Sequence, residues 1–149
     1  MGKLIRTAVA AVVASATLAT GGFGGIDANA QSTAGQRTKV VIQVSDSDPA
    51  KWNLALNNVR NVQSDLGPGN VEIEVVAYGP GIGMLKAGSS VSPRVEEALA
   101  AGVSVVACEN TMKGQQLARK DMVDGIGYVP AGVIELIQKQ QQGYAYIRP

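Results

Sequence analysis

The sequence predicts a three-layer α/β sandwich. Short β-branched apolar runs of strand length alternate with longer segments in which apolar residues recur at helical spacing. Gly- and Pro-rich segments separate them. Strands that are joined through helices pair in parallel with right-handed crossovers, and the helices then cover both faces of the sheet.

The first segment, residues 1–30, has the three parts of a secretory signal peptide. Lys3 and Arg6 give a positive start, residues 7–19 are uncharged and rich in Ala and Val, and Ala28-Asn29-Ala30 supplies small residues before a cleavage site at Gln31. We therefore expect a periplasmic or secreted protein. No second apolar run follows, so we expect no membrane association after cleavage. The alternative is an uncleaved N-terminal anchor.

The polar residues 31–38 are predicted to be a disordered linker before one domain at residues 39–149. Residues 40–44 are β-branched and predict a buried strand. Asp48 can cap the helix that follows, and Pro49 suits its first position. The buried stripe of this helix is predicted to contain Trp52, Ala55, Leu56, Val59, Val62 and Leu66.

Residues 71–78 predict a second strand, and its alternating Glu72 and Glu74 indicate a partly solvated face near a sheet edge. Residues 79–83 contain three glycines and predict a tight turn. They lack the glycine and lysine spacing of nucleotide-binding loops. A helix is then expected from Ser92, with Val95, Ala98 and Leu99 inward, to a stop at Gly102.

The third strand is predicted at residues 103–107, with Cys108 at its end. Asn110 or Thr111 can cap a helix that runs towards Lys120. A short strand at 126–129 and a candidate fifth strand at 144–147 flank the last helix. Its apolar lining is predicted to be Val133, Ile134, Leu136 and Ile137.

Composition excludes several classes of function. The chain has no histidine and one cysteine, which excludes Ser-His and Cys-His relays, His-ligated metals, thiolate zinc sites and internal disulfides. We therefore expect no metal. The 13 Lys and Arg residues nearly balance the 12 Asp and Glu residues. This balance gives no electrostatic reason to bind nucleic acid.

Sites in parallel sheets form beyond the carboxyl ends of the strands. Cys108 is the candidate catalytic residue there, because amides at a helix start, and Lys113 one turn away, favour a thiolate. Glu109 opposes this effect. The alternative is a buried structural cysteine. The remaining candidates for a substrate pocket are Ser45, Asp46, Gly79, Gly81, Gly83, Asn110, Lys113 and Pro130.

Four segments together resemble the DsrE-like family, over residues 38–149. They are residues 40–45 (VVIQVS), 77–85 (AYGPGIGML), 105–112 (VVACENTM) and 125–133 (GIGYVPAGV). The resemblance implies a parallel five-stranded sheet between helices and homo-oligomers, either trimers or hexamers. It also implies that the cysteine at the end of a middle strand, here Cys108, carries sulfur as a persulfide. The export signal and the Glu-Asn-Thr-Met that follows Cys108 set this chain apart as an uncharacterised exported branch.

Two functions follow as hypotheses. The first is a sulfur carrier or sulfur transferase that uses Cys108 without a metal or an organic cofactor, together with a sulfur donor or acceptor protein. The second is a non-catalytic oligomeric binding module in which Cys108 is packed. A secreted hydrolase is a weaker third reading, because the chain lacks histidine.

Overall fold

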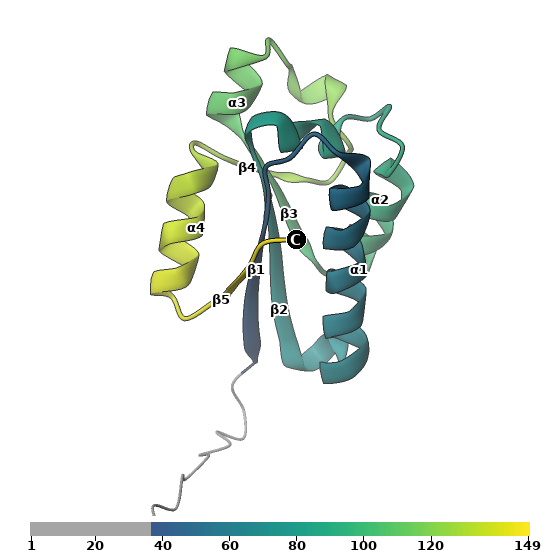
Figure 1. Ribbon diagram of the computed structural model, residues 1–149, viewed down its shortest axis with the longest axis vertical. Coiled ribbons are helices and arrows are strands. Elements are labelled where there is room, and N and C mark those ends of the chain that lie inside the picture. The colour runs from purple at the N-terminus through teal and green to yellow at the C-terminus, as the bar shows by residue number, and fades with distance from the viewer. Residues whose placement is uncertain (1–36) are drawn as a thin grey trace, which may run out of the picture. The chain divides into compact units, whose positions relative to one another are not determined.

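The computed structural model describes residues 37–149, which form a five-stranded parallel sheet with helices on both faces (Figure 1). The predicted signal peptide and residues 31–36 of the predicted linker lie outside the described residues. The strands are β1 (Thr38–Val44), β2 (Val71–Ala77), β3 (Ser104–Cys108), β4 (Gly127–Val129) and β5 (Ala145–Ile147). The helices are α1 (Pro49–Leu66), α2 (Ser92–Ala100), α3 (Glu109–Gly114) and α4 (Gly132–Gln141). Three short 3-10 helices are η1 (Pro68–Asn70), η2 (Gly79–Leu85) and η3 (Arg119–Asp121).

The strand order is β4-β3-β2-β1-β5, and every pairing is parallel. The register aligns Val44 with Ala77, and Ala77 with Ala107. The carboxyl ends of β1, β2 and β3 therefore meet at one edge of the sheet. This confirms the predicted three-layer sandwich with five strands. β1 begins at Thr38, which the sequence analysis placed at the end of the linker.

The start of α1 follows the predicted cap. The backbone N–H of Ala50 donates to Asp48 Oδ1 at 2.8 Å, and Pro49 occupies the first turn, where no amide hydrogen is required. Trp52, Ala55, Leu56 and Val59 are buried as predicted. Leu66, in the last turn of α1, is 43% exposed, whereas the pattern placed it in the buried stripe.

The two faces of the sheet are covered unequally. α1 and α2 lie on one face and α4 lies on the other (Figure 1). The face under α1 and α2 holds the large apolar core, which includes Ile42, Val75 and Val105. The α4 face holds a much smaller apolar cluster: Val41, Val76, Val106, Leu136 and Tyr144.

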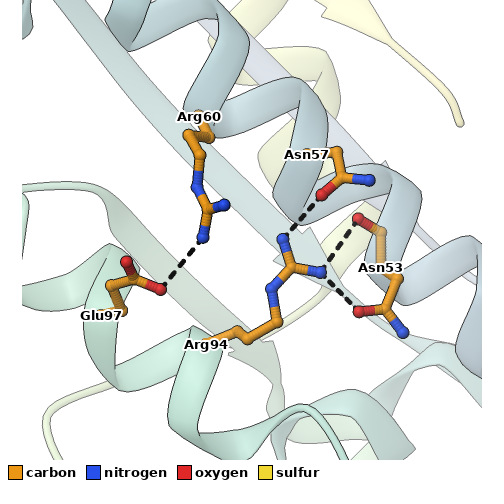
Figure 2. Close-up of polar contacts among 5 residues, drawn as sticks. All are labelled: Asn53, Asn57, Arg60, Arg94 and Glu97. Atoms are coloured by element: carbon orange, nitrogen blue, oxygen red, sulfur yellow. Dashed lines mark hydrogen bonds and ion pairs between the residues drawn. The ribbon is translucent and has the colours of Figure 1, made fainter.

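Polar contacts join α1 to α2 beside the large core (Figure 2). The Arg94 guanidinium of α2 donates to Asn57 Oδ1 at 2.8 Å and to the side chain of Asn53. Arg60 and Glu97 form an exposed ion pair at 3.2 Å. Arg60, Arg94 and Glu97 border a cavity of about 300 Å³ that is also lined by Leu56 and Val59.

Two expectations about the α4 face were wrong. β2 is the central strand and not near an edge, and Glu74 is only 5% exposed, although Glu72 is exposed. Strand pairing depends on contacts distant in sequence, which the alternation of residues within one strand does not report. The apolar residues of the last helix do not all face inward. Of the four predicted positions only Leu136 is buried, whereas Val133, Ile134 and Ile137 are 53%, 49% and 45% exposed.

The connections also differ from the prediction. The helix after β3 stops at Gly114 and does not continue to Lys120, because Gln116 adopts a left-handed backbone conformation with φ of 56°. The predicted tight turn at residues 79–83 is the beginning of η2. Within residues 37–149, none of the helices combines the length and apolar character needed to span a membrane.

Candidate functional site

Cys108 is the last residue of β3 and the N-cap residue of α3. Its side chain is 5% exposed. Side chains alternate along a strand, so Cys108 lies on the same face as Val106, which packs under α4. The thiol is therefore placed at the carboxyl edge of the sheet, on the α4 face.

Four hydrogen-bond donors lower the pKa of the Cys108 thiol. They are the backbone N–H groups of Asn110, Thr111 and Gly132 and the Thr111 side chain. Asn110 and Thr111 lie in the first turn of α3, and Gly132 is the first residue of α4. The amides that open a helix have no partner within it, so the starts of α3 and α4 bring backbone donors close to one sulfur.

The Thr111 hydroxyl is oriented by the neighbouring segment. Its oxygen accepts the N–H of Gly79 at 2.9 Å. Because that lone pair is engaged, the hydroxyl proton is free to be donated to the Cys108 sulfur. Gly79 is held in turn by Gln115, whose side-chain amide donates to the Gly79 carbonyl oxygen at 3.2 Å.

These hydrogen bonds decide the acidity of the thiol. Burial is the largest single influence and raises the pKa of Cys108, but the four hydrogen bonds together outweigh it, and the pKa is lowered. Hydrogen bonds to the charged form favour that form, and the thiolate is the nucleophilic state of cysteine. The site therefore favours a thiolate in a location that solvent barely reaches.

Tyr78 lies beside the thiol. It follows Ala77, which pairs with Ala107, so Tyr78 and Cys108 are neighbours on adjacent strands. A Cβ built on Gly132 would lie 2.9 Å from Tyr78 Cβ and 3.1 Å from its ring. Only glycine allows the start of α4 to approach this closely. Burial and the nearby Tyr146 raise the pKa of the Tyr78 phenol, against a smaller opposing hydrogen bond from Ser45.

Four of the predicted pocket residues gather around this centre. The Asn110 N–H donates to the Pro130 carbonyl oxygen at 3.2 Å, and it also contributes to the lowered pKa of Cys108. Gly79 orients Thr111. Ser45 reaches the centre through its hydrogen bond with Tyr78, and its hydroxyl oxygen also accepts from Gln43 at 2.9 Å.

The other four lie in different surroundings. Lys113 is exposed and borders a shallow cleft with Met112, Leu117 and Arg119. The Asp46 carbonyl oxygen accepts the Trp52 indole N–H at 2.7 Å. Gly83 packs on the same indole ring, and a Cβ added at Gly83 would lie 3.1 Å from the ring. Gly81 crosses the end of β1, where an added Cβ would lie 2.3 Å from the Val44 carbonyl oxygen.

Glu109, which was expected to oppose a thiolate, is turned to the surface. Its carboxylate pairs with Arg119 at 2.7 Å, and the side chain is 45% exposed. Arg119 also lies over the Tyr128 ring, 4.1 Å from its centroid. The negative charge next to Cys108 in sequence is thus neutralised by a partner that lies away from the sulfur.

Three residues of the site were missed by sequence reasoning: Tyr78, Thr111 as a hydrogen-bond donor, and Gly132. The Pro130-Ala131-Gly132 segment carried a signal, since a glycine that opens a helix after a strand marks close approach of backbone. Among residues 37–149, no cluster of three or more Cys, Asp or Glu side chains is placed to hold a metal ion.

The comparisons with known proteins concern nearly the whole described region. The model of the DsrE/DsrF-like family matches residues 38–149. A search of curated proteins finds no match. The structure of MTH1491, a protein of unknown function from Methanobacterium thermoautotrophicum, is 37% identical with a TM-score of 0.72, over 75% of this chain and 99% of that one.

Two further structures share the fold at lower identity. BT1422, a conserved protein of unknown function from Bacteroides thetaiotaomicron, is 17% identical with a TM-score of 0.61, over 74% of this chain and 94% of that one. The ychN protein from E. coli is 13% identical with a TM-score of 0.57, over 76% of this chain and 99% of that one. The family model covers most of the chain, and its range includes all five strands and the Cys108 centre. The chain therefore belongs to the DsrE/DsrF-like family.

Proposed function

We propose that this protein is a sulfur carrier in which Cys108 accepts a sulfane sulfur and passes it to another protein. The observation that carries the proposal is the position of Cys108 at the carboxyl end of β3, where donors at the starts of α3 and α4 lower the pKa of its thiol. Membership of the DsrE/DsrF-like family supports it. The donors that lower the pKa of the thiol also favour Cys108 as a leaving thiolate when an acceptor takes the transferred sulfur.

The proposed reaction is an exchange between sulfur atoms. The Cys108 thiolate attacks the outer sulfur of a donor persulfide, R–S–SH. A new S–S bond forms to Cys108, the donor S–S bond breaks, and the donor leaves as the thiolate R–S⁻. The proton remains on the transferred sulfur. In the second step an acceptor thiolate attacks that sulfur and Cys108 leaves as a thiolate, so neither step needs an external oxidant or reductant.

The test is the mass of the intact protein after incubation with a low-molecular-weight persulfide. We expect a gain equal to one sulfur atom, reversed by a reducing thiol. The matched control is Cys108→Ser, which has no other cysteine to react. Absence of the adduct on the folded wild type, under conditions that load a cysteine peptide, would contradict the proposal.

A binding module with a packed cysteine is the second candidate, and the 5% exposure of Cys108 favours it. The two candidates differ in how the native thiol reacts. A sulfur carrier must expose its sulfur during turnover, so a small alkylating reagent modifies the folded protein readily. A packed structural cysteine reacts only as fast as the protein unfolds.

We also propose that the chain is exported through its N-terminal segment and assembles as a homo-oligomer. The charged start and the apolar run at residues 7–19 support export. The exposed Val133, Ile134 and Ile137 of α4 support assembly, since a second copy could bury them. Cell fractionation with N-terminal sequencing tests export, and light scattering tests assembly. A monomer at micromolar concentration would contradict the second point.

A further inference from the structure

A buried ion pair fixes α4 to the middle of the sheet. Glu74 projects from the central strand β2, and its Oε2 accepts Ser104 Oγ at 3.0 Å and Lys139 Nζ at 2.9 Å. The side chains of Lys139 and Glu74 are 17% and 7% exposed. Removing one partner of such a pair leaves a charge uncompensated in a poorly solvated place, so the pair holds its two elements together.

The apolar packing of α4 on the sheet depends on one large buried side chain, Leu136. Leu136 and Gly132 are its buried residues, whereas Val133, Ile134 and Ile137 point outward. Lys139 also approaches Glu135 at 3.8 Å, but Glu135 is on the same helix and cannot anchor it to the sheet. The contact between Lys139 and Glu74 is therefore a major attachment of α4 to the strands.

The same helix delivers a hydrogen bond to the thiol. Gly132 opens α4 against Tyr78, beside Cys108, and its N–H contributes to the lowered pKa of the thiol. Lys139 lies two turns later on the helix. A helix of this length moves as a rigid body, so a shift at Lys139 displaces Gly132.

We propose that Glu74 and Lys139 are positioning residues for Cys108, which hold α4 so that the Gly132 N–H stays on the sulfur. The inference deepens the proposed sulfur chemistry but is measured on the free thiol, so it can fail independently of persulfide formation. It assigns a role to a buried charge pair that does not touch the reacting atom.

Other charged groups surround the pair and enter the test. Oε1 of Glu74 has no hydrogen-bond donor, and the carboxyl of Glu135 lies against Glu74, so a proton on Glu135 is placed to fill that position. Lys139 lies 4.9 Å from the centroid of the Tyr144 ring, whose hydroxyl donates to Glu72. Lys39 lies on the same ring at 5.5 Å.

The experiment measures the rate at which iodoacetamide alkylates the single cysteine as a function of pH. The pH at the inflection reports the thiol pKa, and the plateau rate reports access to the sulfur. The variants are Glu74→Gln, Lys139→Met and the double variant. The matched control is Arg60→Met, which breaks the exposed ion pair with Glu97 on the opposite face (Figure 2).

Glu74→Gln distinguishes a positioning effect on the thiol pKa from a direct effect of the Glu74 charge, because the two effects have opposite signs. Removing a negative charge would by itself lower the thiol pKa, whereas loss of the Gly132 N–H raises it. We expect the inflection to move to higher pH in all three variants, with a severalfold fall in alkylation rate below the inflection, and not to move in Arg60→Met.

An inflection that falls or stays unchanged in folded Glu74→Gln would overturn the proposal. If that variant does not fold, the double variant decides, because it removes both charges of the Glu74–Lys139 pair and its net change in charge is zero. An unchanged inflection in the folded double variant would equally overturn the proposal.

Discussion

The two faces of the sheet show different uses of the same strands. The face under α1 and α2 is almost wholly apolar and supplies most of the buried core. The α4 face combines a small apolar cluster with the buried carboxylate of Glu74, which pairs with the half-buried Lys139, and it carries Cys108 at its edge. The comparison teaches that a parallel sheet can hold most of its apolar core on one face and its polar groups on the other, because alternate residues of each strand point to opposite faces.

The difference between the two faces is tested most directly by making the same substitution on each of them. Leu56 in α1 and Leu136 in α4 are each 4% exposed. We expect Leu56→Ala to lower the free energy of unfolding by about 2–5 kcal/mol and Leu136→Ala to lie at the lower end of that range, because its surroundings are less densely apolar. Urea denaturation measures both values. Only Leu136→Ala should move the pH of the Cys108 alkylation inflection; an equal shift in Leu56→Ala would remove the distinction between the faces.

A smaller effect is expected where α4 meets Tyr78. Gly132→Ala places a methyl group 2.9 Å from Tyr78 Cβ, so the helix start must move. We expect a loss of about 1–3 kcal/mol in unfolding free energy, together with a higher Cys108 thiol pKa as the Gly132 N–H withdraws. Gly88→Ala is the matched control, because nothing lies within 4 Å of its added Cβ. A Gly132→Ala protein as stable as this control would show that the contact between the start of α4 and Tyr78 is not tight.

The smallest effect concerns the charges of the α4 face. Burial, followed by the charge of Glu74 and a hydrogen bond with it, raises the pKa of Glu135, against the opposing Lys139. An acid whose pKa is raised on folding stabilises the fold below its unfolded pKa, and that stability is lost as pH rises through the folded pKa. We therefore expect Glu135→Gln to gain about 0.5–1 kcal/mol at neutral pH, since the amide can donate to Glu74 at every pH. The gain should shrink as the pH is lowered. Thermal unfolding across pH measures it, and a less stable variant at neutral pH would mean that the contact with Lys139 dominates.

The sequence predicted the local parts of this molecule well and the non-local parts poorly. The strands, the α1 cap at Asp48 and the place of Cys108 at a strand end follow from periodicity and turn chemistry within a few residues. The central position of Glu74 depends on which strands pair, and the role of Gly132 depends on a helix that returns to the thiol from later in the chain. Neither is encoded in neighbouring residues. Lys113 was misjudged because one turn of separation does not specify the direction of a side chain.

The crossing of η2 over the end of β1 has a consequence for sequence variation. Gly81 lies where a Cβ would be 2.3 Å from the Val44 carbonyl oxygen and 2.8 Å from the Ser45 nitrogen, and both are backbone atoms that no rotamer change can move. Gly88 lies a few residues later with open space around it. Among related chains of this fold, we therefore expect position 88 to accept other residues and position 81 to remain glycine. An alignment in which position 81 varies as freely as position 88 would mean that β1 and η2 cross differently in those relatives.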